Sequence, residues 1–228
     1  MAKKLRYQKS LVQSDTFIKP LTLLNSAQEF YVSMMKESTI TFCLGPAGTG
    51  KTYLATYVAL EALLSNEVDK IILTRPLVAT EDIGYLPGTM DEKIAPYLMP
   101  LFDAIEYHIG IVRSKQLFAD NRIEILPLAY MRGRSLNRSF MILDEAQNTT
   151  KEQMKMFLTR IGYNSKIVIT GDTAQSDLQG VQENGMVWST NRLKGITGDI
   201  GVTEFSARDI VRNPLIEKIL RHLDGPGQ

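Results

Sequence analysis

The sequence predicts an α/β fold built on a parallel β-sheet with helices on both faces. Six short segments are rich in β-branched residues and almost continuously apolar, which is typical of strands buried on both sides. Segments with helical character lie between them, and this alternation favours parallel strands joined by crossover helices. The chain has 228 residues, 44% of them hydrophobic, which is enough for one large domain with its own core.

The expected strands and helices alternate along most of the chain. The strands are expected at residues 39–44, 70–74, 122–126, 140–143, 166–170 and 201–205. The helices are expected at residues 27–36, 52–64, about 91–107, 151–160 and 214–223. In the third helix, Ile94, Leu98, Leu101 and Ile105 recur at three- and four-residue spacing and should face the core. Since ligands bind at the carboxyl ends of parallel strands, functional side chains should follow the strand ends.

Three regions of different composition are expected. Residues 1–16 contain several lysines and an arginine and should form a flexible basic arm, which is either simply solvated or touches nucleic acid. Residues 17–223 should form one domain that carries all the motifs described below. Residues 224–228, with the sequence DGPGQ, should form a flexible tail.

Charge, cysteine usage and hydropathy exclude several classes of protein. The formal net charge is +1, so any nucleic-acid site must be a local patch of charge. Cys43 is the only cysteine, so no disulfide can form within the chain. No apolar run reaches the roughly 18–20 residues that span a bilayer, and no signal-peptide pattern is present. The expected location is the cytoplasm, with no membrane partner.

A glycine-rich segment follows the first expected strand and opens a helix. Its sequence, GPAGTGKT, matches the P-loop pattern GxxxxGK[ST] in that structural context. The glycines let several N–H groups converge on one phosphate, and the helix N-terminus adds its positive dipole end. Lys51 should reach the β- and γ-phosphates of ATP, and the Thr52 hydroxyl should bind Mg²⁺. The predicted nucleotide-binding residues of this loop are Gly45, Pro46, Ala47, Gly48, Thr49, Gly50, Lys51 and Thr52.

Two adjacent acids end the strand expected at 140–143. Placing carboxylates at the end of an apolar strand is unfavourable unless they have a function, although such acids can also be solvated or can cap a helix. Together with the P-loop, Asp144 is expected to hold Mg²⁺, directly or through water. Glu145 is expected to orient and deprotonate the attacking water. This pair favours hydrolysis over phosphate transfer to a small acceptor.

Three short stretches resemble motifs of superfamily 1 helicases. The acids extend to DEAQ, which resembles motif II, and residues 24–28 (LNSAQ) look like the adenine-reading Q motif. Residues 171–175 (GDTAQ) resemble motif III. By this resemblance Gln28 would contact the adenine edge and Gln175 would sense the γ-phosphate. The alternatives are an exposed helix residue for Gln28 and a polar loop residue for Gln175.

The combined motifs identify the chain as similar to the PhoH family of P-loop ATPases. The stretches that carry the resemblance are GPAGTGKTYLA, IGYLPGTMDEKIAP, RGRS, ILDEAQNT, LTR, TGDTAQSDL and DIVRNP, in this order within residues 20–223. The resemblance implies a single RecA-like ATPase core, arranged as a head-to-tail ring, with a hexamer as the family's arrangement. It implies RNA helicase or remodelling activity, and compact members occur in bacteriophages, which would place such a protein in the host cytoplasm. One departure is Arg212-Asn213, where many members have Arg-His.

A single core lacks the second lobe that supplies arginines to the γ-phosphate in superfamily 1 helicases. Such an arginine finger is worth about 10³–10⁵ in rate, so hydrolysis is either slow or completed by a neighbouring subunit. Arg208 and Arg212 are expected at the nucleotide, because they follow the last strand. Arg132 and Arg134 are assigned either to the nucleotide or to nucleic acid. Ordinary surface ion pairs are the alternative for all four.

Residues 75–96 follow the second strand, where helicase motif Ia contacts nucleic acid. Arg75 and Lys93 are the expected phosphate contacts there, in addition to Arg132 and Arg134. The alternative is a loop that contacts a neighbouring subunit.

Two functions remain in competition. The first is an ATPase with Mg²⁺ that acts on single-stranded RNA or DNA. The second is a nucleotide-gated oligomeric assembly module with slow ATPase and no translocation. A P-loop kinase is disfavoured by the DEAQ sequence and by the Q-like motif.

Overall fold

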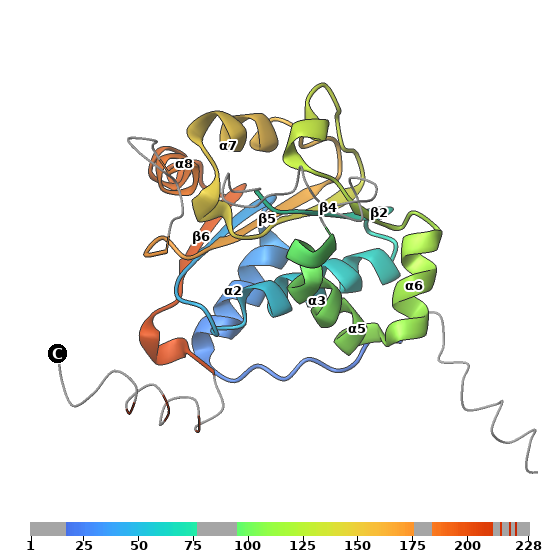
Figure 1. Cartoon of the computed structure of the whole chain (residues 1–228). Coiled ribbons are helices and arrows are strands. Elements are labelled where there is room, and N and C mark those ends of the chain that lie inside the picture. The colour runs from blue at the N-terminus through green and yellow to red at the C-terminus, as the bar shows by residue number, and fades with distance from the viewer. Residues whose placement is uncertain are drawn as a thin grey trace, which may run out of the picture.

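The computed structural model describes residues 17–76, 95–175 and 184–211, together with residues 215, 219 and 222. Its centre is a six-stranded sheet with the order β3-β2-β4-β5-β1-β6, in which every pairing is parallel (Figure 1). The strands are β1 (Ile40–Leu44), β2 (Lys70–Thr74), β3 (Ile123–Ile125), β4 (Ser139–Leu143), β5 (Lys166–Gly171) and β6 (Ile200–Glu204).

Helices cover both faces of the sheet (Figure 1). One face carries α2 (Ser26–Glu37), α3 (Lys51–Leu64), α5 (Met99–Ile109) and α6 (Ile111–Ala119). The other carries α7 (Lys151–Leu158) and α8 (Gly185–Leu193). Short 3₁₀ helices lie at Ala95–Leu98, Leu128–Met131, Ala146–Asn148 and Ala207–Asp209. Among these described elements, no helix is both long and apolar enough to cross a bilayer.

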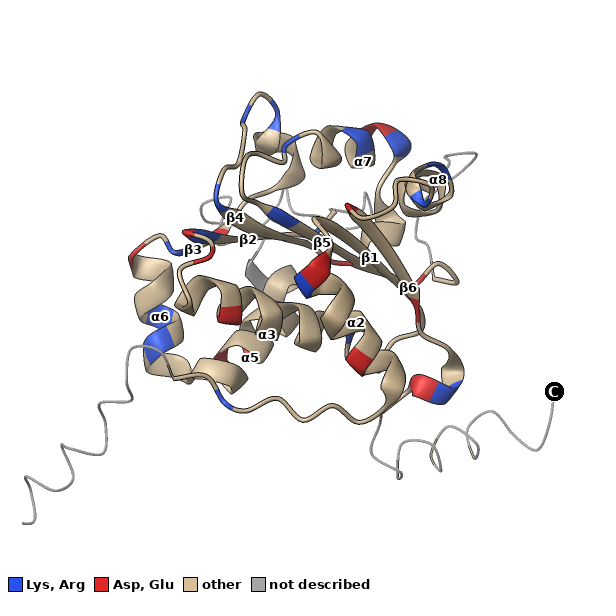
Figure 2. Cartoon of the chain, turned by 180° about the vertical axis from the view of Figure 1, so that it is seen from behind, with Lys and Arg blue, Asp and Glu red and all other residues tan. Residues whose placement is uncertain are grey.

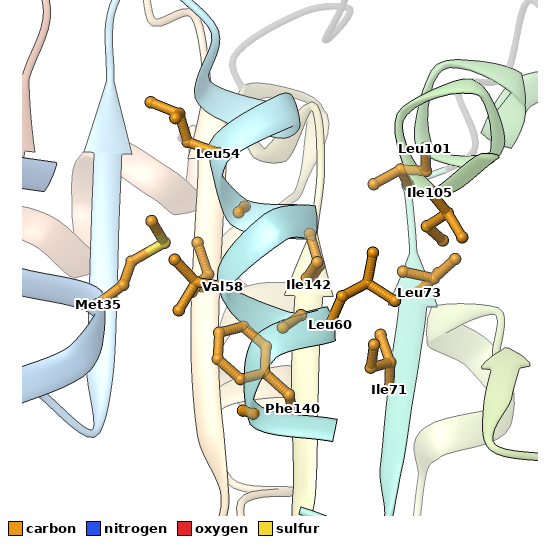
Figure 3. Close-up of a cluster of buried hydrophobic side chains, with 14 of the residues drawn as sticks. Met35, Leu54, Val58, Leu60, Ile71, Leu73, Leu101, Ile105, Phe140 and Ile142 are labelled. Atoms are coloured by element: carbon orange, nitrogen blue, oxygen red, sulfur yellow. The ribbon is translucent and has the colours of Figure 1, made fainter. Parts of the chain in front are cut away.

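The strands distribute their side chains between two cores, because successive residues of a strand point to opposite faces. On β4, Phe140 and Ile142 join the core under α2, α3 and α5, whereas Met141 and Leu143 join the core under α7 and α8. Figure 3 shows Leu60 of α3 lying over these strands in the first core. Burying a leucine of this kind contributes roughly 1.5–3 kcal/mol. The nearly continuous apolar character of the strands follows from this burial on both sides.

The predicted fold class is confirmed. All six expected strands are present, and four of the expected helices are found within one to two residues over their described parts, except that the third begins as a 3₁₀ turn at Ala95–Leu98. Leu98, Leu101 and Ile105 face the core as predicted, and Ile94 lies outside the described residues. The helix expected at 214–223 lies mostly outside the described residues, although Leu215, Ile219 and His222 are helical.

Helices α6 and α8 were not predicted. The segment of α6 is short and carries four polar side chains in its first six residues. The segment of α8 begins with glycine, which disfavours a helix. It is initiated by Asn184, whose side chain accepts hydrogen bonds from the backbone N–H groups of Met186 and Val187. A cap of this kind compensates for a weak helix former at the first position.

The parallel register brings four strand ends to one edge of the sheet. Leu44 of β1 is paired with Gly171 of β5, and Thr74 of β2 is paired with Leu143 of β4. Strand β5 therefore lies between the strand that enters the P-loop and the strand that ends in the two acids. The residues that follow these ends meet in one row, which is where the sequence places its motifs.

Candidate nucleotide-binding site

The P-loop joins β1 to α3 through glycines in the left-handed region. Gly45 has φ +139° and Gly50, the N-cap residue of α3, has φ +89°. A Cβ on Gly45 would lie 2.5 Å from the carbonyl oxygen of Phe205, so the adjacent segment leaves no room for a side chain. The loop thus needs glycine at this position both for its conformation and for close packing.

Lys51 folds back over the loop that precedes it. Its Nζ donates to the carbonyl oxygens of Gly45 at 2.6 Å and of Pro46 at 2.8 Å, and the residue is 9% exposed. Burial lowers the pKa of Lys51, while the nearby Cys43 thiol and the carboxylates of the site act in the opposite direction. The ammonium is therefore held at the mouth of the loop, where a phosphate oxygen can replace a carbonyl.

Thr52 and Asp144 meet across the site. The Thr52 hydroxyl donates to Oδ1 of Asp144 at 2.9 Å, and the Thr170 hydroxyl donates to the same oxygen. Asp144 is only 6% exposed, and its backbone N–H donates to the carbonyl of Thr74 at 3.0 Å. A fixed carboxylate beside a hydroxyl is the oxygen-only arrangement that Mg²⁺ prefers, with phosphates and water completing its shell. The residues present fit this ion.

Glu145 has an unusual backbone conformation for a residue with a side chain. Its φ of +54° places it in the left-handed region, at a cost on the order of 1–3 kcal/mol. Its Oε2 accepts a hydrogen bond from Nε2 of Gln147 at 2.6 Å, and its Oε1 lies 3.9 Å from Nη2 of Arg75. The strained backbone and these two contacts direct the carboxylate at the cavity.

Gln147 connects the two strand ends that carry the acids. Its Oε1 accepts from the backbone N–H of Asp172 at 3.0 Å while its Nε2 donates to Glu145. The residue is 3% exposed, so its amide is fixed between β4 and β5. Sequence reasoning placed Gln147 in the DEAQ motif without giving it a role. The position of Gln147 two residues after Glu145 was the one sequence feature that could have indicated this contact.

A cavity of about 560 Å³ opens in front of the P-loop. One side of α5, formed by residues at three- and four-residue spacing, lines it together with Tyr53. Sequence reasoning considered only the core-facing side of this helix and missed the other. The lining residues on α5 are Pro100, Asp103, Ala104 and Tyr107.

Gln28 lies behind the P-loop and does not line this cavity. Its Nε2 donates to the carbonyl of Thr49 at 3.0 Å, its Oε1 accepts from the N–H of Leu24 at 2.9 Å, and the residue is 4% exposed. The Q-like motif is thus physically joined to the P-loop. Its contact with adenine stays a prediction.

Gln175 lines the cavity beside Asp172. Its backbone N–H donates to the Asp172 carbonyl at 3.0 Å, and the Asp172 carboxylate accepts from the N–H of Ala174 at 3.0 Å. This tight turn places residue 175 at the cavity, which Glu145 also lines.

The predicted arginines fall in different places. Arg208 is exposed on the 3₁₀ helix after β6, and its guanidinium has no hydrogen-bond or ion-pair partner among the described residues. The segment that carries it is tied to the P-loop, because the N–H of Val211 donates to the Gly48 carbonyl at 2.8 Å. Arg212 lies outside the described residues.

The residues predicted to contact nucleic acid also lie in different parts of the molecule. Arg75 donates to the Tyr97 carbonyl at 3.0 Å, and its Nη2 lies 3.9 Å from Oε1 of Glu145. The structure thus brings Arg75 beside a carboxylate that lines the cavity, and its contact with nucleic acid stays a prediction. Arg134 pairs with Glu124 at 3.2 Å, and Arg132 is exposed in the same loop, away from the cavity. Lys93 lies outside the described residues.

The parallel sheet, the P-loop and the adjacent hydroxyl–carboxylate pair define a P-loop NTPase with a RecA-like core. A family model described as PhoH-like protein matches residues 18–224, and the chain belongs to this family. The chain is 49% identical over 207 residues to a PhoH-like protein of Bacillus subtilis, which covers 90% of this chain and 65% of that protein. It is 39% identical over 206 residues to protein PhoH of Escherichia coli, covering 88% and 57% respectively.

The chain thus spans about three-fifths of the length of the curated relatives it matches. Among solved structures, it is similar to the UvsW helicase of bacteriophage T4, with a TM-score of 0.47 at 12% identity over 89% of this chain and 67% of that chain. It is also similar to the Pif1 helicase of Candida albicans, with a TM-score of 0.43 at 14% identity over 88% and 44%.

Proposed function

We propose that this chain binds ATP with Mg²⁺ at the P-loop and hydrolyses it. The observation that carries the proposal is the contact between Thr52 and Asp144, whose oxygens lie 2.9 Å apart at the start of α3. Glu145, which follows Asp144 in the chain, lines the cavity in front of the P-loop together with these two residues. This arrangement combines a phosphate-binding loop, oxygen ligands for a metal ion and a carboxylate base.

Each residue of the site has a defined task in this proposal. Lys51 exchanges its loop carbonyls for the β- and γ-phosphate oxygens. Thr52 and Asp144 would hold Mg²⁺, whose chemistry is to neutralise charge on the phosphate oxygens. Glu145 accepts the proton of the attacking water, which contributes about 10²–10⁴ in rate. Gln175 contacts the γ-phosphate from the end of β5.

The site would be completed by a second copy of the chain. No arginine lines the cavity among the described residues. Arg208 is exposed on the 3₁₀ helix after β6, and its guanidinium has no partner within the described part of the chain. Arginine suits the γ-phosphate because its planar fork binds two oxygens at once. We therefore place Arg208 and Arg212 of one copy at the nucleotide of the next, in a head-to-tail ring that by family resemblance is a hexamer.

Hydrolysis is proposed to be coupled to the binding or remodelling of single-stranded RNA or DNA. The second candidate function, a nucleotide-gated assembly module with slow turnover, is favoured by the same lack of a cavity-lining arginine in the described part of the chain. ATPase assays at low salt with added single strands separate the two. Turnover that does not rise with any single strand supports the module, because phosphate contacts are strongest under those conditions.

The ATPase itself is tested with Glu145→Gln. The variant should keep its affinity for ATP, because the P-loop and Asp144 are unchanged, and should lose about 10²–10⁴ in kcat. Lys51→Ala serves as the contrasting variant, since it should lose ATP affinity as well as rate. Undiminished turnover in Glu145→Gln would refute the assignment of the base.

A further inference from the structure

Charge is distributed unequally between the two helical faces. On α7, α8 and the loop at 132–134, the charged residues are Arg132, Arg134, Lys151, Lys155 and Arg192, with Glu152 as the one acid (Figure 2). Helices α2, α3, α5 and α6 carry five acids, Glu29, Glu37, Glu61, Asp103 and Glu106, against four cations, Lys36, Lys51, Arg113 and Lys115. Although the net charge of the chain is only +1, the α7–α8 side therefore forms a basic face.

The only tryptophan of the chain lies on this basic face. Trp188 of α8 is partly exposed, and two cations lie over its indole ring. Nζ of Lys151 and Cζ of Arg192 each lie 5.4 Å from the ring centroid. An aromatic ring beside basic side chains is the combination that single-strand-binding proteins use. A base would stack on the ring as the cations turn from its face to the phosphates.

This face is connected to the catalytic carboxylate through short contacts. The 3₁₀ helix Ala146–Asn148 leads directly from Glu145 to Thr150, the N-cap residue of α7. The N–H of Gly185, at the start of α8, donates to the Thr149 carbonyl at 2.8 Å. A Cβ on Gly185 would collide with the Thr150 carbonyl, so α8 packs directly against this connection. Helix α8 is therefore in direct contact with the segment that leads from Glu145 to α7.

We infer that the α7–α8 face binds a single strand of nucleic acid, with one base stacked at Trp188 and the adjacent phosphates on Lys151 and Arg192. The inference rests on the proposed function, because it supplies the site through which a strand would act on ATP hydrolysis. It differs from the expectation that residues 75–96 form this contact. Binding here would reach Glu145 through the Ala146–Asn148 helix.

The single tryptophan provides a direct test in the full chain. Titration with a short uridine oligonucleotide at low salt should quench Trp188 fluorescence, because a stacked base contacts the indole. Trp188→Leu should weaken binding of a labelled oligonucleotide roughly 5- to 150-fold, whereas Trp188→Phe should retain most of the affinity. Duplex of the same length should not quench the fluorescence.

The charged contacts are tested by the dependence of affinity on salt. Removing one phosphate contact lowers the log–log slope by about 0.7, so Lys151→Ala and Arg192→Ala should each show this decrease. Lys115→Ala, on the acidic face, is the matched control and should leave the slope unchanged.

Three outcomes would overturn the inference. One is binding of the labelled strand without quenching, and another is unchanged affinity in Trp188→Leu. The third is fluorescence that changes with protein concentration alone, which would make the face a contact between subunits. Basal ATPase measured without nucleic acid separates this result from failure of the proposed function, because Trp188→Leu leaves the nucleotide site intact.

Discussion

Gln147 donates a hydrogen bond of 2.6 Å from its Nε2 to Oε2 of Glu145. The opposite end of the same amide accepts from the backbone N–H of Asp172. Because the amide is buried and engaged at both ends, it cannot rotate without breaking one contact. The position of the proposed base therefore depends on the end of β5, where Gln175 meets the cavity.

Replacing Gln147 with leucine should lower kcat by about 10- to 100-fold, the loss typical of an outer residue that orients a reactive group. KM for ATP should change little, because the P-loop is not touched. Steady-state kinetics measure the two quantities, and thermal unfolding shows whether the variant remains folded. Gln116→Leu on α6 is the control. A folded Gln147→Leu variant with unchanged kcat contradicts the positioning role.

Gly45→Ala should destabilise the protein more than Gly133→Ala. Both glycines have positive φ, which costs alanine roughly 1–2 kcal/mol. At Gly45 the added Cβ would also lie 2.5 Å from the Phe205 carbonyl oxygen, whereas at Gly133 no heavy atom lies within 4 Å. Denaturant unfolding of the two variants gives the difference. Equal free energies of unfolding for the two variants would show that the segment after β6 moves to accommodate the Cβ added at Gly45.

The stability of the fold should depend on pH through His108. Burial lowers the pKa of His108 below the ordinary value of 6.5, with a hydrogen bond to the Tyr53 carbonyl acting in the opposite direction and the charge of Lys19 lowering it further. In the window between the folded-state pKa and 6.5, the unfolded chain binds more protons than the folded chain. Stability therefore rises with pH across this window and is constant above it.

His108→Gln should remove this dependence on pH, because it replaces the only buried imidazole among the described residues. The readout is the melting temperature, measured from mildly acidic to neutral pH. His222→Gln is the control, since the chain has two histidines and His222 is exposed. The same acid-induced loss of stability in His108→Gln and in the parent protein would assign it to other groups.

The sequence predicts the sheet well because each strand is buried on both faces and therefore reads as a short apolar run. It predicts the P-loop from the spacing of its glycines, lysine and threonine, and it places Asp144 at a strand end, where the Thr52 hydroxyl meets it. The cavity-lining side of α5 was missed, since residues such as Asp103 and Tyr107 look like ordinary exposed positions on an amphipathic helix. Only the packing of α5 against α3 turns this side toward the cavity in front of the P-loop.

Contacts that depend on tertiary structure were also beyond sequence reasoning. Arg75 was assigned to nucleic acid from its place after β2, yet it lies 3.9 Å from Glu145, because β2 and β4 are neighbours in the sheet. Trp188 was not predicted as a site residue, because one of the two cations over its ring, Lys151, lies on a different helix. The surroundings of Arg75 and of Trp188 are set by strand order and helix packing, which bring together residues far apart in the sequence.

Arg208→Ala should lower kcat by about 10³–10⁵ if its guanidinium reaches the γ-phosphate. If it acts from a neighbouring copy, mixing Arg208→Ala with Glu145→Gln should restore turnover. A site on the first variant then has an intact base, and the second variant supplies the arginine. Turnover per subunit of the parent protein should also rise with concentration as rings form.

Mixing Lys51→Ala with Glu145→Gln is the matched control for this experiment. Each site in that mixture still lacks either the lysine or the base, so no arrangement of subunits can repair it. Recovery in the Arg208→Ala mixture but not in the control therefore requires an arginine shared between copies. A mixture that is no more active than its two components, together with a parent rate that is flat across concentrations spanning monomer and oligomer, would exclude a shared site.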